Sequence, residues 1–170
     1  MNTQKLVLLS ILIAISIVLN IVERFALGGL TGLPMVRLGL ANIVVLMVMY
    51  LYQAKDAFLV LIIRIFLVGI FTSLFSPTFF LSLGGGILAY VGMWIGKSLK
   101  VFSIIGVSVL GSFGHALGQI IAAIIILSTQ ELIVYFPWLV VLSLPTGILT
   151  GFIALKMNTI IKEAFFKASD

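Results

Sequence analysis

The segment Ala57–Leu74, AFLVLIIRIFLVGIFTSL, decides the fold, because it is a continuous apolar stretch interrupted by one arginine. A stretch of this kind is typical of a membrane-spanning helix, and Arg64 is its only charged residue. Placing a guanidinium near the centre of a bilayer costs roughly 2.5–3.5 kcal/mol on insertion scales. Residues of this kind usually face the interior of a helix bundle or a watery cavity, so Arg64 is the first candidate functional residue.

The composition of the whole chain extends this interpretation from one segment to all 170 residues. The chain is 62% hydrophobic and 9% charged, whereas soluble domains carry about 25% charged residues. We therefore expect one integral membrane domain over residues 1–170. The absence of cysteine excludes disulfides, thiolate metal sites and thiol chemistry. The positively charged residues are spread between the apolar spans. This pattern indicates that they set the orientation of the protein in the membrane and do not bind nucleic acid.

The apolar segments predict an all-α membrane protein, a bundle of six transmembrane helices. A span needs about 20 apolar residues. The expected spans are residues 6–22, 36–52, 57–75, 77–95, 101–127 and 132–155. Ser76 and Pro77 mark the start of the fourth span, as N-cap and first helical residue.

The charged residues predict the orientation of these spans. In the six-span topology, one side of the membrane collects Lys5, Lys55, Lys97, Lys100, Lys156, Lys162 and Lys167. The other side carries Arg24 and Arg37 beside Glu23 and Glu131. Because cytoplasmic loops of membrane proteins are enriched in Lys and Arg, we expect a multi-pass cell-membrane protein with both termini in the cytoplasm.

Glycines mark two places where the chain departs from a plain helix bundle. The connection from Glu23 to Pro34, which contains Arg24, Gly28 and Gly29, is long and glycine-rich. It is a candidate lid over an outward-facing cavity, or simply a flexible linker. The triplet Gly84–Gly86 lies inside a span and predicts either local unwinding or very close helix contact.

Four polar residues inside the spans form the candidate ligand site. His115 and Gln119 are four residues apart and share one helix face, as a packing contact or as the wall of a polar pocket. No acidic residue is expected at the depth of Arg64. Arg64 therefore either bonds to backbone carbonyls, Asn42 or Gln119, or it awaits an anionic ligand, since guanidinium groups suit carboxylates and phosphates.

The outer rim of the cavity and the first helix complete the candidate residues. Asn42, expected six residues into the second span, would form an outer rim with Arg37. Ser10 and Ala14 form a small-xxx-small face on the first span, which lets helices approach closely.

Motifs for chemistry are missing. One histidine and no cysteine leave too few good metal ligands, and Asp56 and Asp170 are the only aspartates. The sequence therefore predicts a protein that is not an enzyme, with no catalytic residue, metal or cofactor.

Several motifs together resemble one family. They are Arg37–Asn42 (RLGLAN), Lys55–Phe58 (KDAF), Arg64, Phe75–Pro77 (FSP) and Gly114–Gln119 (GHALGQ). The chain is identified as a member of the Gx transporter family, also called heptaprenyl diphosphate synthase component I. That family is similar to the substrate-binding S-components of energy-coupling-factor (ECF) transporters.

The resemblance implies a fold and a set of partners. It implies six helices with both termini inside and a ligand pocket capped by the loop Glu23–Pro34. The Ser10 and Ala14 face would dock a transmembrane coupling subunit, which works with two ATPases. Serine stands here in place of the usual first alanine.

Three functions follow as hypotheses. The first is the membrane-embedded binding component of a transporter for a vitamin-like small molecule, anionic or amphipathic, held by Arg64, Asn42, His115 and Gln119. The second is a non-catalytic membrane subunit associated with heptaprenyl diphosphate or menaquinone synthesis. The third is a membrane component of flavin- or quinone-linked extracellular electron transfer.

Overall fold

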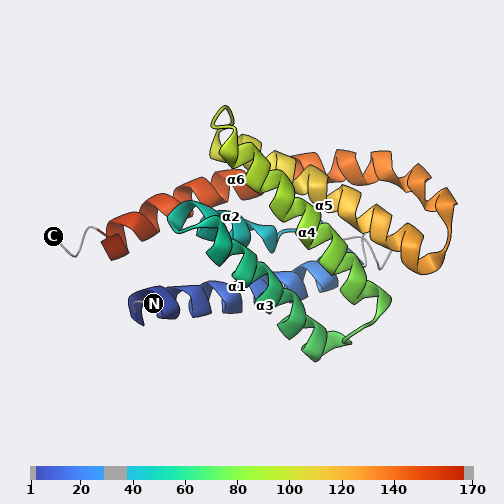
Figure 1. The fold of residues 1–170 in the computed structure, drawn as a ribbon, viewed down its shortest axis with the longest axis horizontal. Helices are drawn as coiled ribbons and strands as arrows, with labels where there is room; N and C mark the ends of the chain where they lie inside the picture. The colour runs from blue at the N-terminus through green and yellow to red at the C-terminus, as the bar shows by residue number, and fades with distance from the viewer. Residues whose placement is uncertain (1–2, 29–37, 167–170) are drawn as a thin grey trace.

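The computed structural model describes residues 3–28 and 38–166, and over this part of the chain it is all-helical. In chain order the helices are α1 (Thr3–Gly28), α2 (Asn42–Leu51), α3 (Ala54–Thr72), α4 (Pro77–Ser98), α5 (Ile104–Leu127), the 3-10 helix η1 (Gln130–Tyr135) and α6 (Phe136–Phe166). The side chains of residues 24–28 and 165–166 lie outside the described part. Helix α1 begins and α6 ends at the same end of the molecule (Figure 1).

The expected all-helical fold is confirmed, and the chain is a membrane protein with four long apolar candidate spans in its described part. They are Thr3–Glu23, Pro77–Ser98, Ile104–Leu127 and Gln130–Ala164. Helix α2 has 10 residues, or about 15 Å, which is half of the hydrocarbon thickness. Helix α3 has 19 residues but carries Lys55, Asp56 and Arg64. Four of the six predicted spans thus correspond to long apolar helices in the described part of the chain, and for α2 and α3 the span stays a prediction.

Side-chain caps explain where three of the helices begin. The Ser76 hydroxyl accepts a hydrogen bond from Phe79 N at 3.3 Å, with Pro77 in the first turn, as predicted. Ser103 caps α5 in the same way through Gly106 N at 3.2 Å. Gln53 and Asp56 form a capping box at the start of α3. Each cap satisfies a backbone N–H that the helix leaves unpaired.

The helices differ from the predicted spans at two ends. Helix α1 continues as far as Gly28, although its apolar candidate span ends at Glu23, next to the predicted end at residue 22. Helix α2 begins at Asn42 and not at residue 36, because Gly39 has a φ of +79° and its carbonyl accepts from Asn42 N in a turn. Asn42 is thus the first residue of α2, not a residue six positions into a span.

Glycine contacts bring α4 and α5 together. A Cβ on Gly84 would lie 2.8 Å from the carbonyl oxygen of Gly118, and one on Gly92 would lie 2.8 Å from that of Leu110. Both distances are closer than a side chain tolerates. The triplet Gly84–Gly86 remains helical within α4, so close helix contact and not unwinding is its structural consequence. This contact fixes the position of the polar residues on α5.

The core lies where α2 is enclosed by its neighbours. Every residue of α2 from Asn42 to Met49 is buried, and these side chains pack with Leu8, Leu12, Leu61 and Val107. Many apolar residues on the outer faces of α1 and α6 are exposed, as expected for surfaces that contact lipid.

Candidate functional site

Four buried side chains from three helices form a continuous hydrogen-bonded chain, called here the Arg64 network. It consists of Arg64 on α3, Asn42 at the start of α2, and His115 and Gln119 on α5. Arg64 Nη2 donates to Asn42 Oδ1 at 3.1 Å. Asn42 Nδ2 lies 3.2 Å from His115 Nδ1, and His115 Nε2 lies 2.9 Å from the amide of Gln119. The structure therefore joins the four polar residues that the sequence singled out.

The direction of these hydrogen bonds fixes the chemical state of His115. The bond from Arg64 holds the Asn42 oxygen, so the Asn42 amide nitrogen is the atom that faces His115. His115 Nδ1 must then accept, which places the proton of a neutral imidazole on Nε2. The structure places Gln119 Nε2 at 2.9 Å from His115 Nε2. An amide's oxygen and nitrogen are told apart only by their partners, so exchanging the two atoms puts the Gln119 oxygen in position to accept from Nε2. The network orders four residues around an uncharged imidazole.

Three glycines provide the space for the network. A Cβ on Gly39 would lie 2.9 Å from both Asn42 Nδ2 and His115 Cδ2. A Cβ on Gly85 would lie 2.8 Å from His115 Nδ1 and Cε1, and one on Gly86 would lie 3.7 Å from Arg64 Nη2. Backbone from the start of α2 and from α4 therefore packs directly on the polar side chains, which leaves little room for water.

Glu23 lies at the same cavity as Arg64, which corrects two predictions. It belongs to α1 and is 2% exposed, not part of a loop at the membrane boundary. Its carboxylate accepts hydrogen bonds from Gly39 N at 2.6 Å and from Leu40 N at 3.1 Å. Glu23 and Arg64 line the same cavity, so an acid lies near Arg64, which the sequence did not predict.

The cavity beside the network, called here the Glu23 cavity, is small. Its volume is about 20 Å³, enough for one water but far below the roughly 300 Å³ of a small-molecule pocket. Its lining residues come from α1, the start of α2, α3, α4 and α5: Asn20, Glu23, Gly39, Ala41, Arg64, Ile65, Val68, Gly69, Thr72, Thr78, Phe79, Ser82 and His115.

Sequence reasoning missed part of this lining. Thr72, Thr78 and Ser82 line the cavity at the α3–α4 corner, yet single hydroxyl residues in apolar helices gave no signal. Glu23 could have been found from its spacing: it lies seven residues after Ser16, and both are buried on the face of α1 that also buries Leu9 and Leu12.

The remaining predicted residues lie elsewhere. Ser10 and Ala14 are exposed on the outer face of α1, away from the cavity. Arg37 and Gly29 lie outside the described residues, as does the side chain of Arg24, while Gly28 is described only as the last residue of α1. The lid predicted over residues 23–34 is thus described only where it is helix α1. Among the described residues, no group of three or more His, Cys, Asp or Glu side chains is placed to hold a metal.

Comparison with known proteins gives one match. The sequence model of the heptaprenyl diphosphate synthase component I family matches residues 12–157, which is most of the chain and includes the Arg64 network and Glu23. Comparison with curated proteins and with solved structures gave no match.

Proposed function

We propose that this chain, which belongs to the heptaprenyl diphosphate synthase component I family, is the membrane-embedded binding component of a small-molecule transporter. The observation that carries the proposal is the Arg64 network. Ionisable residues inside a membrane protein are costly and usually mark a ligand or ion path. Here one such residue, 4% exposed, is joined to three polar side chains at a cavity that also contains a carboxylate.

The small volume of the cavity means that ligand entry requires helix movement. Glu23 holds α1 against the start of α2 through its bonds to Gly39 and Leu40. Loss of those two bonds would let α1 move away from α2 and enlarge the cavity. We therefore assign Glu23 the role of a latch, in place of part of a loop lid.

The chemistry of the lining restricts the ligand. Arg64 favours an acidic or phosphate-like group. Glu23 at the same cavity would repel a ligand that carried only negative charge. A small molecule with an acidic group and also hydrogen-bond donors fits this pair better than a simple anion.

The topology and the partners are part of the same proposal. The lysine-rich end is cytoplasmic, α2 and α3 lie within the bilayer beside the four long helices, and both termini are inside. The exposed face of α1 around Ser10 and Ala14 docks a coupling subunit, with two ATPases supplying the energy. The chain itself performs no catalysis and needs no cofactor.

The family description favours one alternative. A non-catalytic membrane subunit of prenyl diphosphate synthesis would hold a prenyl or quinone molecule, not a water-soluble one.

The deciding experiment is mass spectrometry of small molecules that co-purify with the chain in detergent, with Arg64→Ala as the test variant and Lys156→Gln as the control. A water-soluble molecule lost only from Arg64→Ala supports transport, particularly if a coupling subunit and ATPases are also captured. A prenyl lipid or quinone supports the alternative, and equal retention by both variants would reject the Arg64 site.

A further inference from the structure

Asn158 on α6 is a buried amide without a hydrogen-bond partner in the described part of the chain. It is 5% exposed, and neither Oδ1 nor Nδ2 has a partner. A buried amide left unsatisfied costs about 1–3 kcal/mol. Such a group points to a ligand when it lines a space large enough to hold one.

Asn158 lines a groove of about 350 Å³, called here the Asn158 groove. The groove lies between the end of α2, the start of α5 and the last third of α6. Its lining is Tyr50, Ser103, Ile104, Ile105, Leu155, Asn158, Thr159 and Lys162. The volume is within the range of small-molecule pockets, unlike that of the Glu23 cavity.

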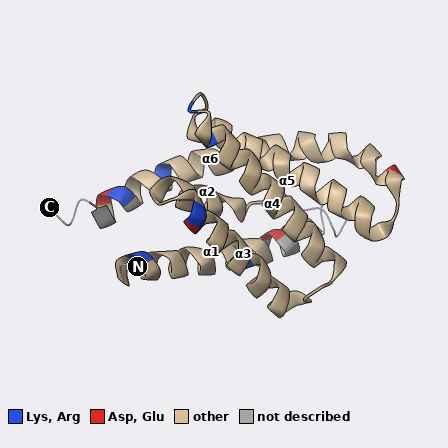
Figure 2. Cartoon of the chain, in the orientation of Figure 1, with Lys and Arg blue, Asp and Glu red and all other residues tan. Residues whose placement is uncertain are grey.

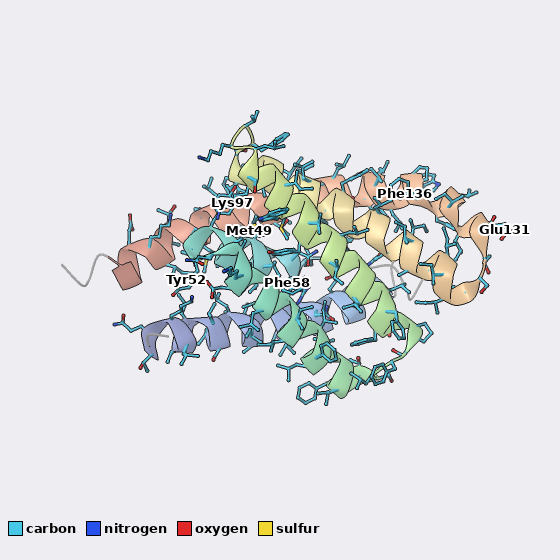
Figure 3. All side chains as sticks on the ribbon, viewed as in Figure 1. Met49, Tyr52, Phe58, Lys97, Glu131 and Phe136 are labelled. Carbon is cyan, nitrogen blue, oxygen red and sulfur yellow. The ribbon has the colours of Figure 1, made fainter. Side chains whose placement is uncertain are left out.

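Positive charge surrounds the groove. Lys162 lines it directly, and the ammonium of Lys97 lies 4.8 Å from the ring centroid of Tyr50. Lys97 also donates to the carbonyl of Met49, next to Tyr50 (Figure 3). Lysines gather toward the end of the molecule that holds the start of α1 and the end of α6, whereas Glu131 is at the opposite tip (Figures 2 and 3). Glu163 is the acidic neighbour of Lys162 on α6, and it is exposed.

The wall of the groove is mainly apolar, with a few polar groups. Ile104, Ile105 and Leu155 contribute apolar surface, while Asn158, Lys162 and Tyr50 supply donors and positive charge. A ligand that fits both kinds of surface has an anionic oxygen group joined to an apolar chain. Basic pockets between transmembrane helices at the inner surface are suited to phosphate headgroups.

We propose that the Asn158 groove binds the phosphate group of an amphipathic molecule, with its hydrocarbon chain along Ile104, Ile105 and Leu155. The Asn158 amide donates to a phosphate oxygen, and Lys162 supplies the balancing charge. The phosphate belongs either to a bilayer phospholipid or to an isoprenoid phosphate, which share this chemistry. This site is separate from the Glu23 cavity and does not depend on transport.

Native mass spectrometry of the full chain in detergent tests the proposal with two probes, phosphatidylglycerol and farnesyl diphosphate. The test variants are Asn158→Leu, which keeps the branching and the number of heavy atoms, and Lys162→Gln, which changes an exposed residue. The control is Lys156→Gln, an exposed lysine on the same helix that does not line the groove. Both test variants should weaken probe binding about ten-fold, since a hydrogen bond to a charged group contributes about 1.5–3 kcal/mol, and the control should not.

The probe that responds identifies the source of the phosphate. Weakened phosphatidylglycerol binding assigns the groove to a membrane lipid, and weakened farnesyl diphosphate binding assigns it to an isoprenoid phosphate. Binding of both probes that is unchanged in Asn158→Leu and Lys162→Gln, or equally weakened in Lys156→Gln, would overturn the proposal. Lys162→Gln keeps the test decisive if Asn158→Leu fails to fold.

Discussion

Asn42 and Asn158 are both about nine-tenths buried or more, yet their surroundings differ in every other respect. The Asn42 amide joins Arg64 to His115, and the adjoining cavity holds about one water. The Asn158 amide has no partner among the described residues, and Asn158 lines a groove of about 350 Å³. The first asparagine contributes to folding through its partners, whereas the second costs folding free energy until a ligand supplies them. The same residue type thus marks a preorganised site in one region and an unfilled one in the other.

The sharpest test of this difference is one substitution made at both positions. Asn42→Leu removes one hydrogen-bond partner of Arg64 and one of His115 together, and each such loss at a buried group costs about 1–3 kcal/mol. We expect a loss of about 3 kcal/mol in unfolding free energy. Thermal unfolding in detergent, followed by tryptophan fluorescence, measures it.

Asn158→Leu is the matched control, with the opposite sign expected. Leucine has the same branching as asparagine, and replacing an unsatisfied buried amide by an apolar group of similar shape is neutral or stabilising, by up to about 1 kcal/mol in lipid-free detergent. Equal destabilisation by the two variants would show that Asn158 is already satisfied and that the two regions do not differ.

The helix contact behind the Arg64 network gives the next largest effect. In Gly85→Ala the new methyl would lie 2.8 Å from the His115 ring, so the ring must move and its bond to Asn42 must lengthen. Overpacking of this kind costs about 1–3 kcal/mol. The same thermal measurement applies, and the Asn158 groove should keep its probe affinity.

Gly106→Ala is the control for this crowding. A Cβ there would lie 3.3 Å from the Phe102 side chain, at the start of α5 and away from the network. It should cost less than Gly85→Ala. Both substitutions gain helix propensity, because Ala is favoured over Gly by about 1 kcal/mol, so the difference between them reports the contact. A larger cost for Gly106→Ala would mean that contact with His115 does not set the effect.

The sequence predicted the parts of these two regions that depend on local sequence. Each member of the Arg64 network was found because it is a polar residue within an apolar run, and such a residue can be recognised from its sequence neighbours alone. Glu23 was misplaced because the apolar run ends beside it while the helix does not. Whether a helix continues past an apolar run depends on tertiary burial, which the run length does not record. Asn158 was not singled out from the sequence, since its lack of a partner depends on how α6 packs in three dimensions.

The latch proposed for Glu23 predicts a change in access to the Glu23 cavity. The chain has no cysteine, so Thr72→Cys places a single thiol in the cavity lining. In Glu23→Gln the neutral amide has only one oxygen that can accept from Gly39 N and Leu40 N. That bond is weaker than a bond to the charged carboxylate of Glu23. The thiol should react with a water-soluble maleimide about ten-fold faster when Glu23→Gln is combined with Thr72→Cys than in Thr72→Cys alone. This ratio corresponds to a change of about 1.4 kcal/mol in the free energy of cavity opening. Equal rates would mean that other contacts hold α1.

The smallest effect is expected at the lysine-rich end, where Lys5 Nζ lies 2.7 Å from Asp56 Oδ1 across α1 and α3. Both side chains are partly exposed, and pairs of this kind contribute about 0–1 kcal/mol. Lys5→Gln should therefore lower unfolding free energy by less than 1 kcal/mol, and the loss should shrink further in high salt because mobile ions screen the pair. Asp56→Asn should cost slightly more, since Asp56 Oδ2 also accepts from Gln53 N in the cap of α3. A Lys5→Gln loss comparable to that of Asn42→Leu would mean that α1 is held mainly at this end, and the hold assigned to Glu23 would then have to be abandoned.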